Sequence, residues 1–228
     1  MYYDANLQLG QPDVSAQVSQ MKEKGVQLIS TCMDQRETLI LAKEIQKQHL
    51  NAVQSLPNSY DPKFASDNAA LFEGSFVAPQ FTALEYTPRV KAAQEYIDWM
   101  GKLGKPVTEI AGYGWINALQ FVHALKLAGP DFTQQKVINS LNQDTSFDAG
   151  GMIQPIDWTR QHNDPTGPNH STNSKYSGKY NCSSGVKIHD GKFVPLQTSG
   201  KQWTCMVGGD NAPTLTKTPT YMSFPQAG

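Results

Sequence analysis

Apolar positions follow two different spacings over the first part of the chain. The runs at residues 26–31 and 52–56 are typical of short strands, and each ends in polar residues. Between them the apolar residues recur at helical spacing: Leu39, Ala42 and Ile45. A similar helical face precedes the first strand, between a capping Asp13 and the stop at Gly25: Val14, Val18 and Met21. The order helix, strand, helix, strand predicts an α/β fold with a parallel sheet and flanking helices.

The later parts of the chain differ from the first in predicted elements and in residue composition. The middle predicts a mostly helical block: residues 89–103, 109–128 and 133–141. From Gly150 onward the chain is rich in Gly, Pro, Ser, Asn and Thr. Its clearest element is a hairpin, with strands at residues 186–188 and 193–196 joined through Asp190-Gly191.

Three polar or aromatic residues follow the two predicted strands: Asp34, Asn58 and Tyr60. Open parallel sheets bind ligands in the crevice outside the carboxyl ends of their strands. We therefore expect these residues to line one wall of a ligand site.

Each of the three residues also has a purely structural interpretation. Asp34 and Glu37 have the spacing of a capping box for the following helix. Asn58 can form an Asx turn after Pro57, and Tyr60 can cover the sheet edge. The sequence leaves both interpretations open at all three positions.

Tyr113 and Trp115 lie near the start of the longest predicted helix and are further candidates for ligand contact. Gly112 and Gly114 beside them would let the backbone approach a ligand closely. Packing in the core is the alternative, above all for Trp115. A dinucleotide fingerprint is excluded, because Asn117 stands where the third glycine belongs.

Composition narrows the classes of partner. Charged residues make up 17% of the chain and the formal net charge is −1, which argues against nucleic acid or an anionic membrane surface. No apolar run reaches the length of a membrane span, and the first residues do not resemble a signal peptide. Residues 1–3 look like the end of a strand, so we expect the chain to lack its natural start.

The three cysteines predict one bridge and one free thiol. Cys182 and Cys205 flank the predicted hairpin, and a disulfide between them would stabilise this loop-rich region by about 3 kcal/mol and imply an oxidising compartment. Two unrelated thiols are the alternative. Cys32 is expected to be a small buried side chain rather than a catalytic thiol, because no histidine lies near it in sequence.

The five histidines show no metal-ligand spacing, and no cofactor is expected. His123 falls inside an apolar helix and is interpreted as a core residue with a hydrogen-bond partner. No Gly-x-Ser-x-Gly elbow and no phosphate loop occurs.

Several segments together resemble a known family: residues 13–60 with Thr31-Cys32-Met33-Asp34, Gly112-Tyr113-Gly114-Trp115-Ile116-Asn117-Ala118, Gly150-Gly151-Met152-Ile153 and Pro155-Ile156-Asp157-Trp158. They look like the C-terminal portion of a type I periplasmic binding protein. The resemblance is to the branched-chain amino acid, or leucine-binding, group of substrate-binding proteins that serve ABC importers.

The resemblance implies a fold of two α/β lobes joined by three crossings, with the ligand trapped between them. Residues 1–80 would then be a second-lobe α/β segment and residues 81–148 a helical segment of the first lobe. Residues 149–228 would return to the second lobe with the hairpin and tail. The rest of the first lobe would be absent from this chain.

The resemblance also suggests roles for single residues. Asp34 matches a strand-end position that contacts ligand and is commonly aromatic in leucine-binding members. Asn58 matches a position where those members use an acidic side chain to meet the ligand's ammonium group. Asp34 is a candidate to take over that ionic contact in a charge-assisted hydrogen bond.

The function implied is reversible capture of a small polar organic molecule, amino-acid-like in character, and its presentation to an ABC transporter permease. The protein would be periplasmic or extracellular and membrane-associated, and the resemblance allows a lipid anchor in the full-length protein. The alternative is a ligand-sensing domain of a receptor or regulator with the same fold. A third interpretation, an enzyme using Asp34 or Cys32, is disfavoured, so no enzymatic activity is expected.

Overall fold

A computed structural model describes residues 2–4, 6–8, 10–159, 180–196, 201–207 and 220–222. The chain divides into two compact units. The first comprises Met1–Pro79 and Gly185–Leu196, and the second comprises Gln80–Ser184 and Gln197–Gly228. The assignment of these units to the lobes of a binding protein stays a prediction.

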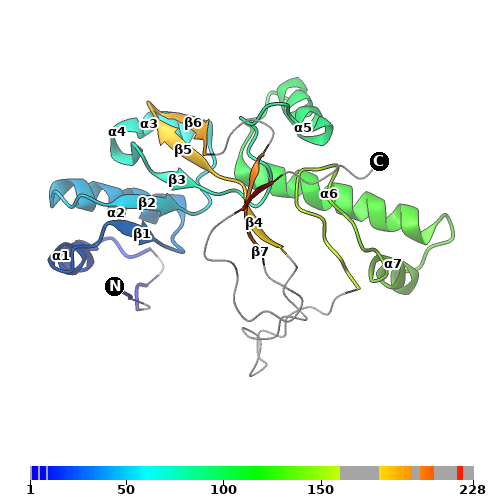
Figure 1. The fold of residues 1–228 in the computed structure, drawn as a ribbon, viewed down its shortest axis with the longest axis horizontal. Coiled ribbons are helices and arrows are strands. Elements are labelled where there is room, and N and C mark those ends of the chain that lie inside the picture. The colour runs from blue at the N-terminus through cyan, green and yellow to red at the C-terminus, as the bar shows by residue number, and fades with distance from the viewer. Residues whose placement is uncertain are drawn as a thin grey trace. The chain divides into compact units, whose positions relative to one another are not determined.

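The first unit is built on a five-stranded sheet in the order β1-β2-β3-β5-β6 (Figure 1). Its strands are β1 (Leu28–Ser30), β2 (Val53–Leu56), β3 (Phe76–Val77), β5 (Val186–His189) and β6 (Lys192–Pro195). The first three strands are parallel, as the alternation of elements predicts, and β5 joins β3 in the antiparallel sense.

The hairpin of β5 and β6 has the predicted turn. Asp190 and Gly191 both adopt positive φ, at 49° and 69°, which is the backbone of a type I′ turn. Asp-Gly tolerates this conformation, and it matches the right-handed twist of the flanking strands. The turn thereby fixes the register in which Val186 pairs with Pro195.

Four helices accompany this sheet: α1 (Ser15–Glu23), α2 (Gln35–Lys47), α3 (Pro62–Asp67) and α4 (Ala69–Phe72). Residues of α1, β1 and α2, with their flanks, share one hydrophobic core: Val14, Val18, Ile29, Met33, Leu41 and Ile45. Figure 1 shows α1 at the β1 end of the sheet and α3 and α4 at the β5–β6 end. The core thus lies on the side of β1 to which Ile29 points.

The second unit contains the three helices predicted for the middle of the chain, α5 (Lys91–Lys102), α6 (Glu109–Ala128) and α7 (Gln134–Leu141). An antiparallel sheet in the order β4-β7-β8 completes what is described of it: β4 (Tyr180–Ser183), β7 (Trp203–Val207) and β8 (Thr220–Met222). Helix α5 begins two residues later than expected, because Val90 has an extended backbone (φ −67°, ψ 146°) and stands as the N-cap.

Helix α6 carries apolar residues on more than one face. Its exposed large apolar residues are Ile110, Phe121, Val122 and Leu127. An apolar helix of this kind normally has its whole circumference buried. None of the described helices is both long and apolar enough to cross a membrane.

Gly112 of α6 is required by a close contact with Phe81. A Cβ at position 112 would lie 2.7 Å from Cζ of Phe81, whose ring is fully buried and cannot swing away. Gly114, half a turn further on, has open space where its Cβ would be. The first glycine is therefore explained by packing within the second unit.

The two glycines predict opposite effects of the same substitution. Gly112→Ala should lower the free energy of unfolding by about 1 to 3 kcal/mol, because it overpacks the Phe81 contact. Gly114→Ala should raise it by about 0.5 to 1 kcal/mol, because alanine restricts the unfolded chain at an open helical position. Urea unfolding followed by circular dichroism measures both, and equal effects of the two changes would contradict the contact.

Candidate functional site

Asp34 lies four residues beyond the end of β1, where its exposed side chain caps α2. The Asp34 carboxylate accepts a hydrogen bond from the backbone N–H of Glu37 at 2.8 Å. The second half of the predicted capping box is not formed, since the Glu37 carboxylate accepts from the backbone N–H of Gly10 instead. One Asp34 oxygen is used in capping, and the side chain as a whole remains open to solvent.

Asn58 lies two residues beyond the end of β2 and is also exposed. Its backbone has φ of 49°, a left-handed conformation that asparagine tolerates better than most residues. Strands β1 and β2 pair in parallel, with Ser30 opposite Ser55, so the loops that carry Asn58 and Asp34 leave the sheet at the same edge. Both candidates on this edge are accessible to a solute.

The side chain of Tyr60 packs against the sheet, as the structural interpretation of this residue predicts. Only 2% of its surface is exposed, and its ring stacks on Phe193 of β6 with centroids 4.8 Å apart. The ring therefore covers the sheet, and its packing gives ligand contact no support.

Tyr113 belongs to the second unit and is partly buried. Its ring meets Phe81 edge-on at 5.8 Å, and its hydroxyl donates to the carboxylate of Glu109. Burial, and next the Glu109 carboxylate, raise the pKa of Tyr113 far above the usual range, although a backbone hydrogen bond with Gln80 acts in the opposite direction. The hydroxyl therefore stays protonated at neutral pH and acts as a donor.

Trp115 packs against Tyr96 with ring centroids 5.8 Å apart. Its indole Nε1 is buried and has no hydrogen-bond partner among the described residues. The packing agrees with the core alternative weighed for this residue. The unpaired N–H is a polar group that a ligand or water could satisfy.

The expectation that Cys32 is buried is wrong: it is an exposed free cysteine. The strand ends at Ser30, and in the turn that follows the inward position is taken by Met33, which is 8% exposed. His123 also differs from expectation, because its ring is partly exposed and its Nε2 pairs with Asp144 at 2.8 Å. The predicted hydrogen-bond partner of His123 is therefore present.

Cys182 and Cys205 are paired directly across β4 and β7. Residues opposite each other in an antiparallel pair have Cα atoms about 4.5 to 5.5 Å apart, which falls inside the span of a disulfide. The side chain of Cys205 lies outside the described residues, so the bridge stays a prediction.

A groove lies along β1 that the sequence did not predict. It has a volume of about 710 Å³ and is lined by residues 24–33, by residues 2–4, 7 and 8, and by Gln17, Met21 and Glu37. The groove depends on the order in which the strands pair. The periodicity of apolar residues along the sequence does not reveal that order.

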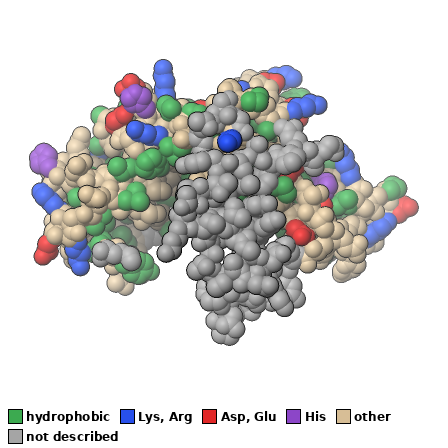
Figure 2. Space-filling view, viewed as in Figure 1, with side chains coloured by type: hydrophobic (Ala, Val, Ile, Leu, Met, Phe, Trp, Pro, Cys, Tyr) green, Lys and Arg blue, Asp and Glu red, His purple; other side chains and the backbone are tan. Residues whose placement is uncertain are grey.

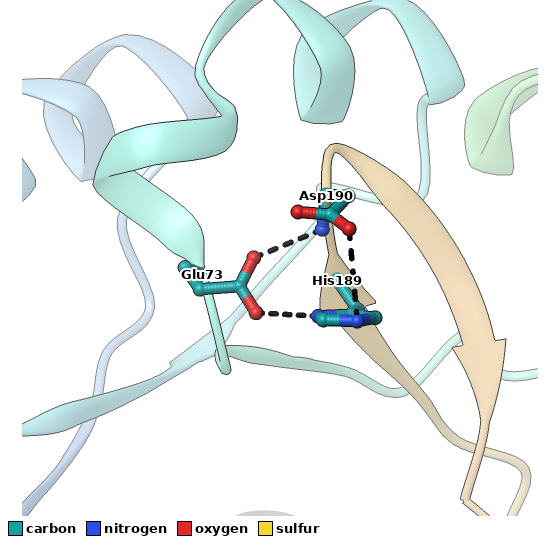
Figure 3. A group of neighbouring side chains, drawn as sticks. All are labelled: Glu73, His189 and Asp190. Atoms are coloured by element: carbon teal, nitrogen blue, oxygen red, sulfur yellow. Dashed lines mark hydrogen bonds and ion pairs between the residues drawn. The ribbon is translucent and has the colours of Figure 1, made fainter.

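A second feature missed by sequence is an exposed cluster of Glu73, His189 and Asp190 (Figure 3). The Glu73 carboxylate contacts Nδ1 of His189 at 2.7 Å and accepts from the backbone N–H of Asp190 at 2.9 Å. These contacts join the residue after α4 to the hairpin turn. The Glu73 carboxylate is engaged by both hairpin residues, so these contacts hold the hairpin turn against the end of α4. We call the three residues a surface clamp.

Comparison with known families gives one clear result. Residues 2–175, more than half of the chain, match the family described as periplasmic binding protein. The chain therefore belongs to the periplasmic binding protein family. A comparison with curated proteins found no match.

Solved structures agree on the type I periplasmic binding fold. A leucine binding protein from Thermotoga maritima has a TM-score of 0.59 at 14% identity, over 82% of this chain and 49% of that one. A branched chain amino acid ABC transporter protein from Thermus thermophilus with bound valine has a TM-score of 0.58 at 17% identity, over 83% and 50%. A fatty acid ABC transporter substrate-binding protein from Thermomonospora curvata has a TM-score of 0.63 at 19% identity, over 85% and 47%. The chain thus spans about half the length of these proteins.

The clamp of Glu73 and His189 predicts a pH-dependent contribution to stability. The hydrogen bond that His189 donates to Glu73, and next the charge of Asp190, raise the pKa of His189 above 6.5. The stabilising contribution of His189 is therefore fully present below that pH and is lost as pH rises through the raised pKa. The hydrogen bond from His189 holds the pKa of Glu73 below 4.5, so its contribution is lost as pH falls through the lowered pKa. The clamp should therefore contribute most to folding stability between pH 4.5 and pH 6.5, the reference pKa values of Glu73 and His189.

An NMR titration of the His189 ring tests this assignment. In the Glu73→Gln variant, the pKa of His189 should move down toward its ordinary value, since the principal partner has lost its charge. Asp190→Asn is the control and should move it less. An unchanged titration in Glu73→Gln would contradict the clamp.

Proposed function

We propose that this chain is part of a solute-binding protein of an ABC importer, and that the loops after β1 and β2 contribute to its ligand site. One observation supports the proposal most. Asp34 and Asn58 are exposed at the carboxyl ends of two adjacent parallel strands, the place where open α/β sheets bind ligands.

The ligand we propose is a small polar organic molecule with an amino-acid-like ammonium group. A carboxylate facing an ammonium group forms a strong charge-assisted hydrogen bond, and Asp34 has one oxygen to spare beyond its capping contact. Asn58 offers both a donor and an acceptor to the same ligand. Two of the similar solved structures are named for leucine and for branched chain amino acids, which agrees with this class of ligand.

Delivery to a permease would follow from closure of two lobes around the ligand, since a closed shape differs from an open one at the surface. We accordingly propose an ABC transporter permease as the partner and a periplasmic or extracellular, membrane-associated location. The function requires no covalent step, and reversible binding is sufficient for it.

Replacing Asp34 separates ligand binding from helix capping. Asparagine is as good an N-cap as aspartate, so Asp34→Asn should leave the free energy of unfolding nearly unchanged. It should weaken the binding of L-leucine or L-valine by at least about 1.5 kcal/mol, because the ionic contact is lost. Isothermal calorimetry and thermal melts on the protein as the cell makes it measure the two effects.

Asp61 provides the matched control. Its carboxylate caps α3 by accepting from the backbone N–H groups of Lys63 and Phe64 at 2.8 and 3.2 Å. Asp34→Ala and Asp61→Ala should each cost about 1 kcal/mol of folding stability. Only Asp34→Ala should also reduce affinity. Full affinity in Asp34→Asn would reduce Asp34 to a capping residue and remove the main support for an ammonium ligand.

We also propose a disulfide between Cys182 and Cys205, and this bridge would imply an oxidising compartment. In denaturant without a reductant, only the thiol of Cys32 should react with a thiol reagent, and Cys182→Ser should expose the thiol of Cys205 as well. Loss of the bridge should cost about 3 kcal/mol on the chain-entropy model. Reaction of all cysteines in the oxidised wild-type protein would contradict the bridge.

A further inference from the structure

The surface clamp contains the parts of a metal site centred on one histidine. Glu73 follows the last residue of α4, His189 ends β5, and Asp190 begins the hairpin turn. One ligand atom from each of the three exposed side chains lies within 4.8 Å of the other two. No other group of three such side chains is drawn together within the part of the chain that the structure describes. The three side chains are therefore close enough to act on one ion.

The Glu73 carboxylate determines which nitrogen of the His189 ring is available to an ion. Its Oε1 lies 2.7 Å from Nδ1 of His189. An ionised carboxylate can only accept, so Nδ1 carries the proton, and Nε2 of the neutral ring has a free lone pair. The backbone N–H of Asp190 holds the other carboxylate oxygen at 2.9 Å. Metal-binding histidines commonly donate their second N–H to a carboxylate in this way.

The free nitrogen, Nε2 of His189, faces a second carboxylate at a suitable distance. It lies 3.7 Å from Oδ2 of Asp190, which is too long for a hydrogen bond. In a tetrahedral site with metal–ligand distances of about 2.0 to 2.2 Å, neighbouring ligand atoms are about 3.3 to 3.6 Å apart. The Asp190 side chain is 85% exposed, so a small rotation can close the difference. Figure 3 shows the two carboxylates at the two different nitrogens of the ring.

The hairpin turn holds His189 and Asp190 in place without an ion. His189 pairs with Lys192 across the hairpin, and Asp190 and Gly191 have the positive φ of a type I′ turn. A Cβ at position 191 would lie 3.0 Å from the Cα of Ser66, so the turn is packed closely on α3. Ligands on such a preformed turn lose little conformational freedom when an ion binds.

The charges and ligand atoms favour a divalent transition-metal ion. Figure 2 shows a histidine side chain among acidic side chains on the surface over the β5–β6 hairpin. The charges of Glu73 and Asp190 attract a cation, and the charge of Lys187 on β5 opposes them. Imidazole suits zinc and copper, whereas magnesium and calcium prefer a full set of oxygen ligands.

We propose that His189 and Asp190 bind a divalent transition-metal ion such as Zn²⁺, with Nε2 and Oδ2 as its protein ligands. Water fills the remaining positions, because the site lies on the surface. Glu73 is a positioning residue that fixes the ring of His189 through Nδ1. The site is separate from the loops after β1 and β2, and an ion that binds only the folded hairpin would stabilise the first unit.

The test titrates Zn²⁺ chloride into the protein as the cell makes it and records long-range ¹H–¹⁵N spectra of the histidine rings. Cys32 is replaced by serine throughout, because an exposed thiol also binds zinc. Zn²⁺ should shift the Nε2 signal of His189 in a saturable way, while Nδ1 keeps its proton. His49 is the matched control, since it is exposed and belongs to no such cluster among the described residues. Its signal should respond only at a Zn²⁺ concentration at least about tenfold higher.

Three variants assign the roles of the side chains. His189→Gln should abolish high-affinity binding at the hairpin. Asp190→Asn should weaken binding by about tenfold or more, and it keeps the fold because Asn-Gly is also a preferred type I′ pair. Glu73→Ala should weaken binding by about tenfold to a hundredfold. It should also leave the ring of His189 in both neutral tautomers, an effect that a merely structural role of Glu73 would not produce.

Four results would overturn the proposal. The first two are the absence of a saturable His189 shift and an unchanged affinity in Asp190→Asn. The third is a response of His49 at the same Zn²⁺ concentration as His189, which would show adventitious binding to any exposed histidine. The fourth is an unchanged affinity and ring tautomer in Glu73→Ala, which would contradict the positioning of the ring by the carboxylate.

Discussion

The parallel pairing of β1 with β2 is the interaction on which the first unit depends. Its register sets Leu28 opposite Val53 and Ser30 opposite Ser55, so both strands end at one edge of the sheet. That shared edge presents Asp34 and Asn58 to solvent, and the alternation along β1 turns Ile29 into the core with α1 and α2. Shifting the register by one residue would turn Leu28 inward and Ile29 out of the core.

Some apolar and strand-edge surface is not covered by the described part of the chain. Strand β1 pairs on one side only among the described residues, and Leu28 is exposed beside its other edge. In the second unit, the apolar helix α6 exposes Phe121 and Val122. The chain spans about half the length of the structures it resembles.

Local signals in the sequence predicted the elements well. Helix α6 has the expected bounds because a glycine and a proline follow its last residue, and the hairpin forms because Asp190-Gly191 accepts positive φ. The sites were harder to predict. Tyr60 is buried by Phe193, which lies far away in sequence, and Glu73 meets His189 across 116 residues. Such contacts depend on strand order, as does the open edge of β1, and periodicity carries no information about strand order.

The central claim is that the loops after β1 and β2 bind an amino-acid-like solute, and NMR mapping of backbone amides tests it most directly. We expect L-leucine or L-valine to shift the amide signals around Asp34 and Asn58 in a saturable way, while the signals of α7 stay in place. Saturable shifts confined to residues of the β1 groove, or no shift anywhere with a broad panel of amino acids, would contradict the account.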